Sequence, residues 1–367
     1  MGVQKKTKLG LGTFDLIKGI AMLMIILAHM TEYYPIREIR AWRILEPILK
    51  VSISMNTFFF LTSGYAFRER SPLKTLKQTA KDFLVPYLWV FGFTVVLTPI
   101  VQYALTRDWH FAVNEMLGRF MGFLFGVPGI ELHEIFGITT LPIWYAIYFL
   151  PSLFIALNVL NLILKVKSDV LQCLLVFLCI STGEMLTKLG FNYYCINIGL
   201  SAVIFPYIGY QFKKHDVIGR VYASKAYRWL FPVLLAVIAT GLMAERYGIK
   251  FVEGSDDFIL DVTVSICIST FLLFVSIPLG NLEWRIFEPI KLVGTYTYWI
   301  MCIHAVDMFA IVPLWRKWGE RMQDHILWAF CIDFCGKLVE IIIVCCVLKW
   351  ISKRIYRRKM KNALPVH

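Results

Sequence analysis

Long apolar segments recur along the whole chain and are separated by short polar or charged ones. About 20 apolar residues are enough for a helix to cross a bilayer, so this pattern predicts about ten membrane-spanning helices. The predicted spans cover residues 13–34, 47–67, 83–105, 141–164, 169–188, 192–212, 228–245, 258–280, 289–312 and 326–350. Residues 109–130 form a shorter, Gly-rich segment interrupted by Asn114, Glu115 and Arg119. That segment is more typical of a re-entrant or interfacial stretch.

Composition fixes the class of protein. Hydrophobic residues make up 58% of the 367 residues and aromatic residues 15%, and the mean hydropathy is +0.64. These values are far from those of a soluble protein. We therefore predict an all-α, polytopic membrane protein. Residues 1–367 are expected to form a single membrane-embedded domain with a basic tail at 351–367 and no appended soluble domain.

The charge distribution bears on orientation. The formal net charge is +13, which by itself is compatible with nucleic acid or anionic lipid as a partner. If the N-terminus is inside the cell, however, most of the 38 Lys and Arg residues fall on cytoplasmic segments. This bias satisfies the positive-inside rule and predicts that both termini are cytoplasmic. The charge thus reflects membrane topology, and no nucleic-acid partner is expected.

Motifs for metal, disulfide and nucleotide chemistry are not apparent in the sequence. The nine cysteines lie almost entirely in apolar segments, with no CxxC pair and no cluster with histidine. We expect no disulfide framework and no structural metal. The chain also has no Walker loop, GxSxG elbow, dinucleotide fingerprint or HExxH motif.

Two ionisable residues lie inside the first apolar segment. Lys18 and His29 are eleven residues apart, which places both on one face of a helix, about 16 Å apart along its axis. Ionisable residues within a membrane span usually face the interior of the bundle and mark functional sites. The alternatives are that Lys18 snorkels to the interface and that His29 is a satisfied interior histidine. The predicted topology puts Lys18 in the inner leaflet and His29 in the outer half of the membrane.

A basic loop follows the second predicted span. Ser63-Gly64 ends that span as a small-residue pair that would suit helix packing. The cytoplasmic loop then carries five basic residues: Arg68, Arg70, Lys74, Lys77 and Lys81. These side chains are equally consistent with an interfacial helix on anionic lipid and with a site for the phosphates of a nucleotide-bearing donor.

The outer side offers weaker candidates. Glu131 and Glu134 flank a histidine in a loop, where they would bind an acceptor or simply be solvated. Trp144 and Tyr145 open the next span and are typical of an aromatic belt at the interface. His304 lies near the end of the ninth predicted span.

Several of these segments resemble the acyltransferase-3 family of integral membrane acyltransferases. The opening helix resembles the family's in Asp15, the Lys18-Gly19-Ile20-Ala21 run and His29, although Lys18 stands where the family has Arg. The family-like segments that follow, in the expected order, are Phe58-Phe59-Phe60-Leu61-Thr62-Ser63-Gly64-Tyr65, Phe83-Leu84-Val85-Pro86-Tyr87, Leu141 to Pro151 and Gly294 to His304. In the last of these, Thr297 replaces Ser and Met301 stands where Tyr is common.

The resemblance implies an acyl-CoA-dependent O-acetyltransferase that modifies a glycan or lipid-linked sugar of the cell envelope. It implies acetyl-CoA bound from the cytoplasm, an extracytoplasmic acceptor hydroxyl and multi-pass residence in the bacterial inner (plasma) membrane. We expect His29 and Lys18 to be catalytic. The expected donor-binding residues are Lys18, Ser63, Arg68, Arg70, Lys77 and Lys81. The expected acceptor-binding residues are Trp144, Tyr145, Glu131, Glu134 and His304.

Two other functions fit the sequence pattern. About ten spans with scattered intramembrane charges also suit a transporter or flippase for lipid-linked saccharides. The prolines, however, do not form the convincing pairs of broken helices that are common in transporters. A partner subunit without chemistry of its own is the third possibility.

Overall fold

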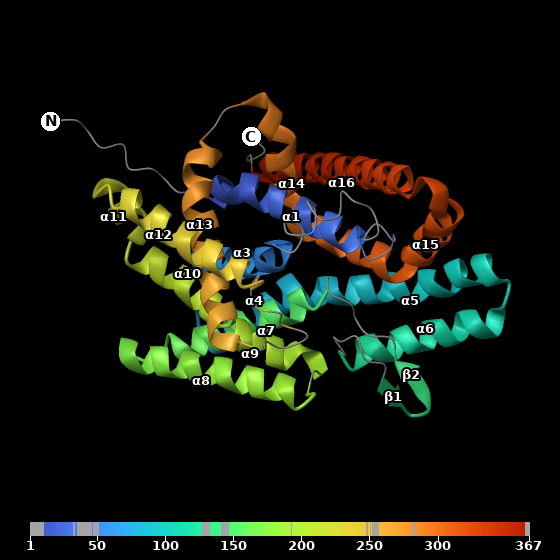
Figure 1. Ribbon diagram of the computed structural model, residues 1–367, viewed down its shortest axis with the longest axis horizontal. Helices are drawn as coiled ribbons and strands as arrows, with labels where there is room; N and C mark the ends of the chain where they lie inside the picture. Colours follow the sequence, from blue (N-terminus) through green and yellow to red (C-terminus); the bar gives the residue numbers. More distant parts are fainter. Residues whose placement is uncertain are drawn as a thin grey trace.

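The computed structural model of this chain is built almost entirely of helices (Figure 1). It describes residues 11–31, 34, 46, 51–126, 133–140, 147–191, 193–246, 249, 251, 257–281 and 284–363. The α-helices are α1 (Asp15–Met30), α3 (Met55–Ala66), α4 (Pro72–Thr79), α5 (Val85–Thr106), α6 (Trp109–Leu124), α7 (Phe149–Ile163), α8 (Asp169–Lys188), α9 (Ile196–Ala202), α10 (Ile204–Lys214), α11 (Val217–Ala223), α12 (Tyr227–Met243), α13 (Phe258–Gly280), α14 (Glu288–Val306), α15 (Val312–Arg321) and α16 (Ile326–Ala363).

Short helical turns and one hairpin complete the fold. The 3₁₀ turns are η1 (Leu11–Phe14), η3 (Val51–Ser54), η5 (Tyr193–Cys195), η6 (Arg285–Phe287) and η8 (Gln323–His325). Two π-helical segments, η4 (Ala80–Leu84) and η7 (Asp307–Ile311), interrupt longer helices. Strands β1 (His133–Ile135) and β2 (Ile138–Thr140) pair antiparallel with Glu134 opposite Thr139.

The prediction of an all-α membrane protein is confirmed, and each of the predicted spans overlaps at least one α-helix. The number of spans is not confirmed. Within the described residues, four helical segments are long and apolar enough to cross a membrane, or up to six if two bent pairs each count as one span. Helix α1 has only 16 residues. Helix α16 carries Asp333, Lys337 and Glu340 inside its apolar part.

The re-entrant or interfacial character expected for residues 109–130 stays a prediction, but the polar residues in this segment do not break its helix. Residues 109–124 form one continuous helix, α6, which packs antiparallel against α5 (Figure 1). Its first turn is capped by Asp108, whose Oδ1 accepts a hydrogen bond from the Phe111 amide at 3.1 Å. A capped N-terminus of this kind satisfies amides that would otherwise be orphaned. The cap and the packing on α5 thus override the polar interruptions.

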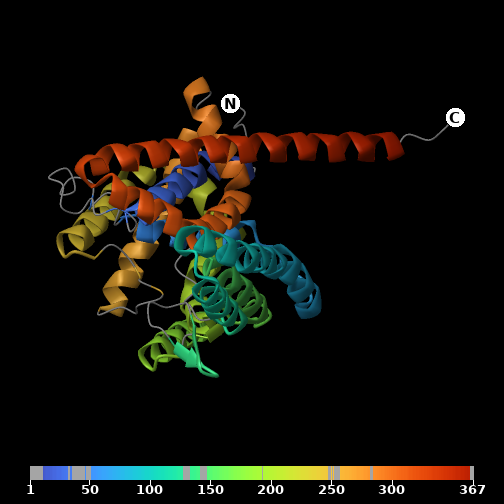
Figure 2. The ribbon, with the colours of Figure 1, turned by 90° about the vertical axis from the view of Figure 1, so that its right-hand side faces the viewer.

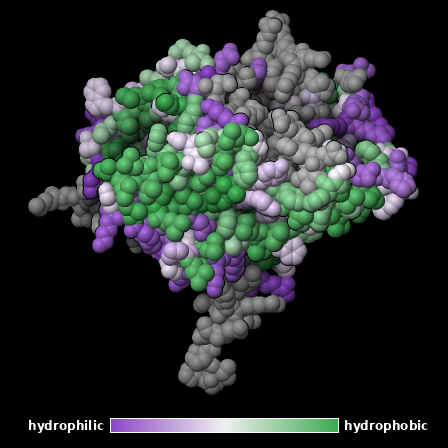
Figure 3. Space-filling model, turned by 90° about the horizontal axis from the view of Figure 1, so that it is seen from below, coloured by the Kyte–Doolittle hydropathy of each residue, from purple (hydrophilic) through white to green (hydrophobic). Residues whose placement is uncertain are grey.

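Three helices from opposite ends of the chain, α1, α14 and α16, lie together, and α16 extends beyond the body of the molecule toward the C-terminus (Figures 1 and 2). Seen from below, apolar residues cover a broad continuous area of the surface (Figure 3). Soluble monomers rarely expose apolar patches of such extent. This surface is what a bilayer would cover.

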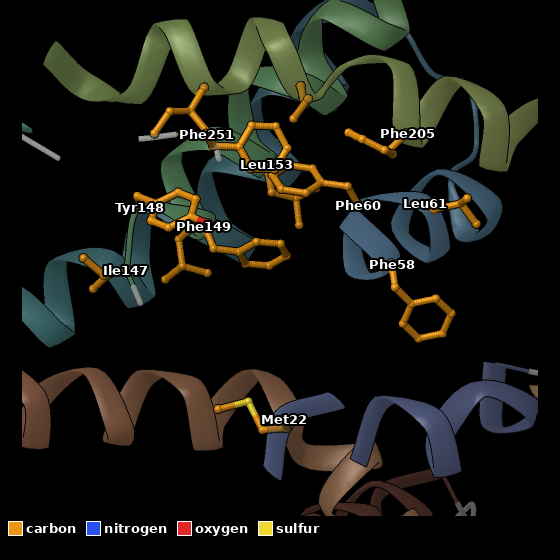
Figure 4. Packing of buried hydrophobic residues seen from close by; sticks show 14 of the residues in the cluster. Met22, Phe58, Phe60, Leu61, Ile147, Tyr148, Phe149, Leu153, Phe205 and Phe251 are labelled. Carbon is orange, nitrogen blue, oxygen red and sulfur yellow. The ribbon is translucent and has the colours of Figure 1, made fainter. Parts of the chain in front are cut away.

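The core is built around α3, whose phenylalanines point to neighbours on several elements (Figure 4). The Phe60 ring contacts Phe149 edge-on, with centroids 4.9 Å apart, and lies 5.8 Å from Phe251. On another side, α3 packs closely on α10. A β-carbon at Gly64 would lie 2.0 Å from the Pro206 carbonyl oxygen, so only glycine fits there. This contact places the C-terminal end of α3 beside that of α10.

Helices α1 and α14 make an equally close contact at a pair of glycines. A β-carbon at Gly19 would lie 2.1 Å from the Ile290 carbonyl oxygen, and one at Gly294 would lie 1.7 Å from that of Asp15. Each glycine thus meets the carbonyl one turn before the other glycine, which fits two helices running in the same direction. Small residues permit such close approach between membrane helices.

Candidate active site

Two histidines from α1 and α14 form a pair inside the molecule. Each follows its contact glycine by ten residues, His29 after Gly19 and His304 after Gly294. Equal spacing along two parallel helices brings the two rings to the same level. His29 Nδ1 lies 3.1 Å from His304 Nε2, and the rings are nearly parallel, with centroids 5.4 Å apart. The close helix contact therefore builds the histidine pair.

A cavity of about 250 Å³ reaches one member of this pair, His304. His304 lines this cavity, whereas His29 is not among the described residues that line it. His29 is connected to the cavity through its contact with His304. Much of the wall is apolar and comes from α1, α3, α7 and α14: Met22, Ile25, Phe59, Phe149, Leu153 and Met301. An apolar wall with a few polar groups is typical of a site for a small molecule.

Lys18 lies in the wall of the same cavity. Its ammonium is 2.5 Å from Asp15 Oδ1, and Asp15 Oδ2 accepts a hydrogen bond from Thr295 Oγ1 at 3.0 Å. The carboxylate thus ties the lysine of α1 to α14. Within the described residues, Lys18 and His304 are the cavity's basic side chains. The prediction that Lys18 and His29 share one face of α1 is consistent with this arrangement.

The remaining polar wall consists of an amide and several hydroxyls. Asn56, at the start of α3, donates from Nδ2 to the Tyr148 hydroxyl at 3.0 Å, which fixes the direction of its amide. The hydroxyls of Ser63 and Thr297 donate to main-chain carbonyls of their own helices, at 2.8 Å to Phe59 and 2.9 Å to Gly294. Their oxygens remain available as acceptors for a molecule in the cavity.

A second space of about 700 Å³ adjoins the first. Four residues line both: Phe14, Ser63, Ala66 and Phe83. The second space carries Arg68, Arg70 and Lys213. The apolar first cavity thus adjoins a space lined by three basic side chains and one carboxylate, that of Asp82.

The loop that presents these arginines is fixed by its neighbours. Asn161 of α7 bonds both the amide and the carbonyl of Arg70, at 3.3 and 3.2 Å. Lys213 donates to the Phe67 carbonyl at 3.0 Å. The close packing of α3 on α10 brings Lys213 to this position. In the sequence, the Lys213-Lys214 pair at the end of an apolar segment gave no signal of this role.

A third, open space of about 420 Å³ lies next to the second and shares Gln78 with it. It is lined by Lys74, Lys77 and Lys81. The opposite side of α4 carries the buried Thr79, whose hydroxyl accepts from Asn158 Nδ2 at 2.8 Å. Because α4 packs through this side, its lysines remain exposed. We call Lys74 and Lys77 of α4, together with Lys81 of the following segment η4, the lysine face of α4.

The structure brings together the predicted donor-side residues, with Lys18 and Ser63 on the first cavity, Arg68 and Arg70 on the second, and Lys77 and Lys81 on the third. It places His304 against His29. Of the predicted outer-side residues, Glu131, Trp144 and Tyr145 lie outside the described residues. Glu134 belongs to β1.

Sequence reasoning assigned no role to Asn56 or Tyr298, yet both line the first cavity. In the sequence, Asn56 is a polar residue inside an apolar segment. That exception is the one signal the sequence contains, because intramembrane polar side chains usually face the bundle interior. Tyr298 belongs to an aromatic run, so its sequence context does not distinguish it from similar neighbouring residues.

Comparison with known proteins identifies the family. The family model described as an acyltransferase domain, of the acyltransferase-3 family, matches residues 11–350, nearly the whole chain, so the chain belongs to this family. The resemblance stated from the sequence is thereby confirmed. No curated protein and no solved structure matches the chain. Family membership and the apolar helices together make this protein a multi-pass membrane acyltransferase.

Proposed function

We propose that the protein transfers an acyl group, most simply acetyl, from cytoplasmic acyl-CoA to a hydroxyl of an extracytoplasmic or lipid-linked glycan. The observation that carries the proposal is the series of three adjoining spaces that leads from the lysine face of α4 to His304. From the lysine face of α4 toward His304, the share of basic side chains in the lining decreases and the apolar part of the lining increases. A CoA thioester has the same gradient, from its phosphates through the pantetheine arm to the acyl group.

The basic spaces suit the nucleotide end of the donor. Arg68, Arg70 and Lys213 line the second space, and arginine and lysine are the usual partners of phosphate groups. The lysine face of α4 would add a more exposed set of positive charges. In this arrangement the thioester enters the first cavity past Ser63, one of the residues that line both spaces.

The histidine pair suits general base catalysis. In the proposed step an imidazole nitrogen takes the proton of the acceptor hydroxyl, and the oxygen attacks the thioester carbonyl. The new C–O ester bond forms, the C–S bond breaks, and the leaving thiolate takes the proton back from the imidazolium. Histidine is suited to this exchange because its ordinary pKa lies near neutral pH.

The geometry favours a division of labour within the pair. His304 faces the cavity, and its Nε2 is engaged with His29. If that nitrogen donates to His29 Nδ1, His304 keeps a lone pair at Nδ1 for the acceptor proton. His29 then holds the tautomer and stabilises the imidazolium, as a carboxylate does in a hydrolase triad. The first proton acceptor is accordingly His304, with His29 acting through it.

Lys18 and Asn56 are positioned to stabilise negative charge. Both line the cavity that ends at His304, and each is oriented by a partner, Asp15 and Tyr148 respectively. A preorganised cation or amide N–H that faces the developing oxyanion lowers the barrier to acyl transfer. We assign Lys18 to the donor side and Asn56 to the carbonyl oxygen. Glu131, Glu134, Trp144 and Tyr145 remain candidates for the acceptor on the outer side.

The test is acyl transfer in membranes that contain the protein, supplied with radiolabelled acetyl-CoA, followed by extraction and identification of the labelled glycan or lipid-linked sugar. We expect His304→Ala and His29→Ala to lower the rate by at least about 100-fold, because each removes part of the base. The matched control is His110→Ala, an exposed histidine of α6. It should keep the wild-type rate.

Equal amounts of folded protein must be confirmed by size-exclusion chromatography in detergent. Full transfer by His304→Ala and His29→Ala would contradict the proposed base. Movement of a lipid-linked sugar across reconstituted vesicles without any acylation would contradict the function and favour a flippase.

A further inference from the structure

A cluster of three charged side chains is buried between η7 and α16. The Lys337 ammonium contacts Asp307 Oδ2 directly and lies 3.9 Å from Asp333 Oδ1. Lys337 is only 4% exposed, and Asp307 and Asp333 are 5% and 2% exposed. When all three are ionised, one positive charge faces two negative ones. We call these three residues the buried charge cluster.

Further side chains hold the carboxylates in place. Tyr34 donates its hydroxyl to Asp333 Oδ2 at 3.1 Å, and the Trp315 ring N–H donates to Asp307 Oδ1 at 3.0 Å. Lys337 also lies 5.3 Å from the centre of the Trp315 ring. Burying three charges in a membrane protein is costly and is usually associated with function. None of these groups takes part in the acyl-transfer step described above.

The buried charge cluster lies next to the histidine pair. Asp307 follows His304 by three residues, where α14 turns into the π-helical segment η7. A small space of about 20 Å³ is lined by His304, Lys337 and Glu340. A space of this size holds about one water molecule. His304 therefore faces the substrate cavity on one side and the lysine of the cluster on the other.

We propose that the buried charge cluster sets the charge state of His304, with Asp307, Asp333 and Lys337 as positioning residues for the base. The excess negative charge favours the imidazolium that forms when His304 takes the acceptor proton. Lys337 limits that effect, so that the imidazole is neutral when the acceptor arrives. This inference rests on the proposed function of His304 as a base.

Other ionisable groups also face His304 and are kept constant in the test. His29 reaches it from α1. In the described part of the chain, Lys18 from α1 and Tyr298 from α14 share the first cavity with it, and Glu340 from α16 shares the small space. Because the variants below leave all of these in place, a change in His304 titration reports the cluster.

The experiment measures the titration of His304 directly. Purified full-length protein in detergent is treated with diethyl pyrocarbonate between pH 5 and 9, and peptide mass spectrometry follows carbethoxylation of His304, which requires the neutral imidazole. Asp307→Asn removes a negative charge and should move the midpoint down by about one pH unit. Lys337→Met removes the positive charge and should move it up by a similar amount. The double variant restores the balance and should return close to wild type.

Lys349→Met, an exposed lysine on the same helix, is the matched control and should leave the midpoint unchanged. Midpoints that stay at the wild-type value, or that move in the same direction in both single variants, would overturn the proposal and leave the cluster a structural tie between η7 and α16. If Lys337→Met does not fold, Asp307→Asn and the double variant decide the question in the same way.

Acetyl transfer measured on the same samples separates this inference from the proposed function. Both proposals are supported if the two single variants shift the His304 midpoint in opposite directions and the acid limb of the pH–rate profile for acyl transfer shifts in the same directions. If the two single variants show opposite midpoint shifts but the wild-type protein transfers no acyl group, the proposed function alone is contradicted, because the cluster still controls the charge on His304.

Discussion

One buried lysine and a group of surface lysines occupy opposite environments in this protein. Lys337 is buried against two carboxylates, next to the histidine pair, whereas the lysine face of α4 is exposed and carries positive charge on an open surface. In the interior each charge must have a partner, so its removal disturbs fold and chemistry together. On the surface, water and salt screen each charge, so its removal should affect only ligand binding. The same side chain is thus indispensable in one region and adjustable in the other.

The largest expected effect is on the interior lysine. Lys337→Met leaves two buried carboxylates without their cation, and we expect it to lower the free energy of unfolding by about 3–5 kcal/mol. The midpoint of thermal aggregation in detergent should fall as a result, and this fall is the measured outcome. Lys349→Met, on the same helix but exposed, should match wild type. Equal midpoints for both variants would remove the contrast between the two regions.

The next effect concerns the helix contact that supports the histidine pair. In Gly294→Ala the new β-carbon would meet the Asp15 carbonyl oxygen, so α1 and α14 must separate. We expect a loss of about 1–3 kcal/mol in stability together with a fall in acyl transfer. Gly336→Ala is the matched control, because its β-carbon would meet nothing within 4 Å. Its thermal midpoint should not fall. Unchanged activity in Gly294→Ala would show that the pair does not depend on this contact.

Lys18 lies between the two extremes, since it is partly exposed but paired with Asp15. Lys18→Met should lower acetyl transfer by about 10- to 100-fold, because it removes a cation from the cavity. Lys18→Arg keeps the charge and restores the residue that is typical of the family, so it should retain most of the rate. Steady-state kinetics with labelled acetyl-CoA distinguishes the two. If Lys18→Met and Lys18→Arg lose the same share of the acetyl-transfer rate, the shape of Lys18 matters and its charge does not.

The smallest effect is expected on the surface. Replacing Lys74, Lys77 and Lys81 together by Gln should raise KM for acetyl-CoA by about 3- to 10-fold and leave kcat unchanged. The effect should shrink at high salt, because exposed charges are screened. The control removes three exposed charges from the end of α16: Lys349, Lys353 and Arg354. If only binding to anionic vesicles changes, the lysine face of α4 contacts lipid.

The sequence alone determined the class of protein and the pattern of its helices. Recurrent apolar segments of membrane length leave little choice, because a backbone in lipid must satisfy its hydrogen bonds within a helix. The local motifs around Lys18, His29 and His304 identified the family. The spacing of Lys18 and His29 also placed both on one face of α1, since helix geometry is fixed by local bonding.

The tertiary structure decided which of these residues meet. Local spacing carries no information about contacts between helices distant in sequence, so the sequence did not indicate that His304 touches His29 or that Lys337 pairs with Asp307. Those contacts depend on close packing at Gly19 and Gly294 and on the course of α16 beside α14. The sequence also could not show how the charges within α16 are accommodated: Lys337 contacts Asp333 of the same helix and Asp307 of η7, and the second contact depends on packing. Local chemistry therefore specified the helices, and packing between them specified the site.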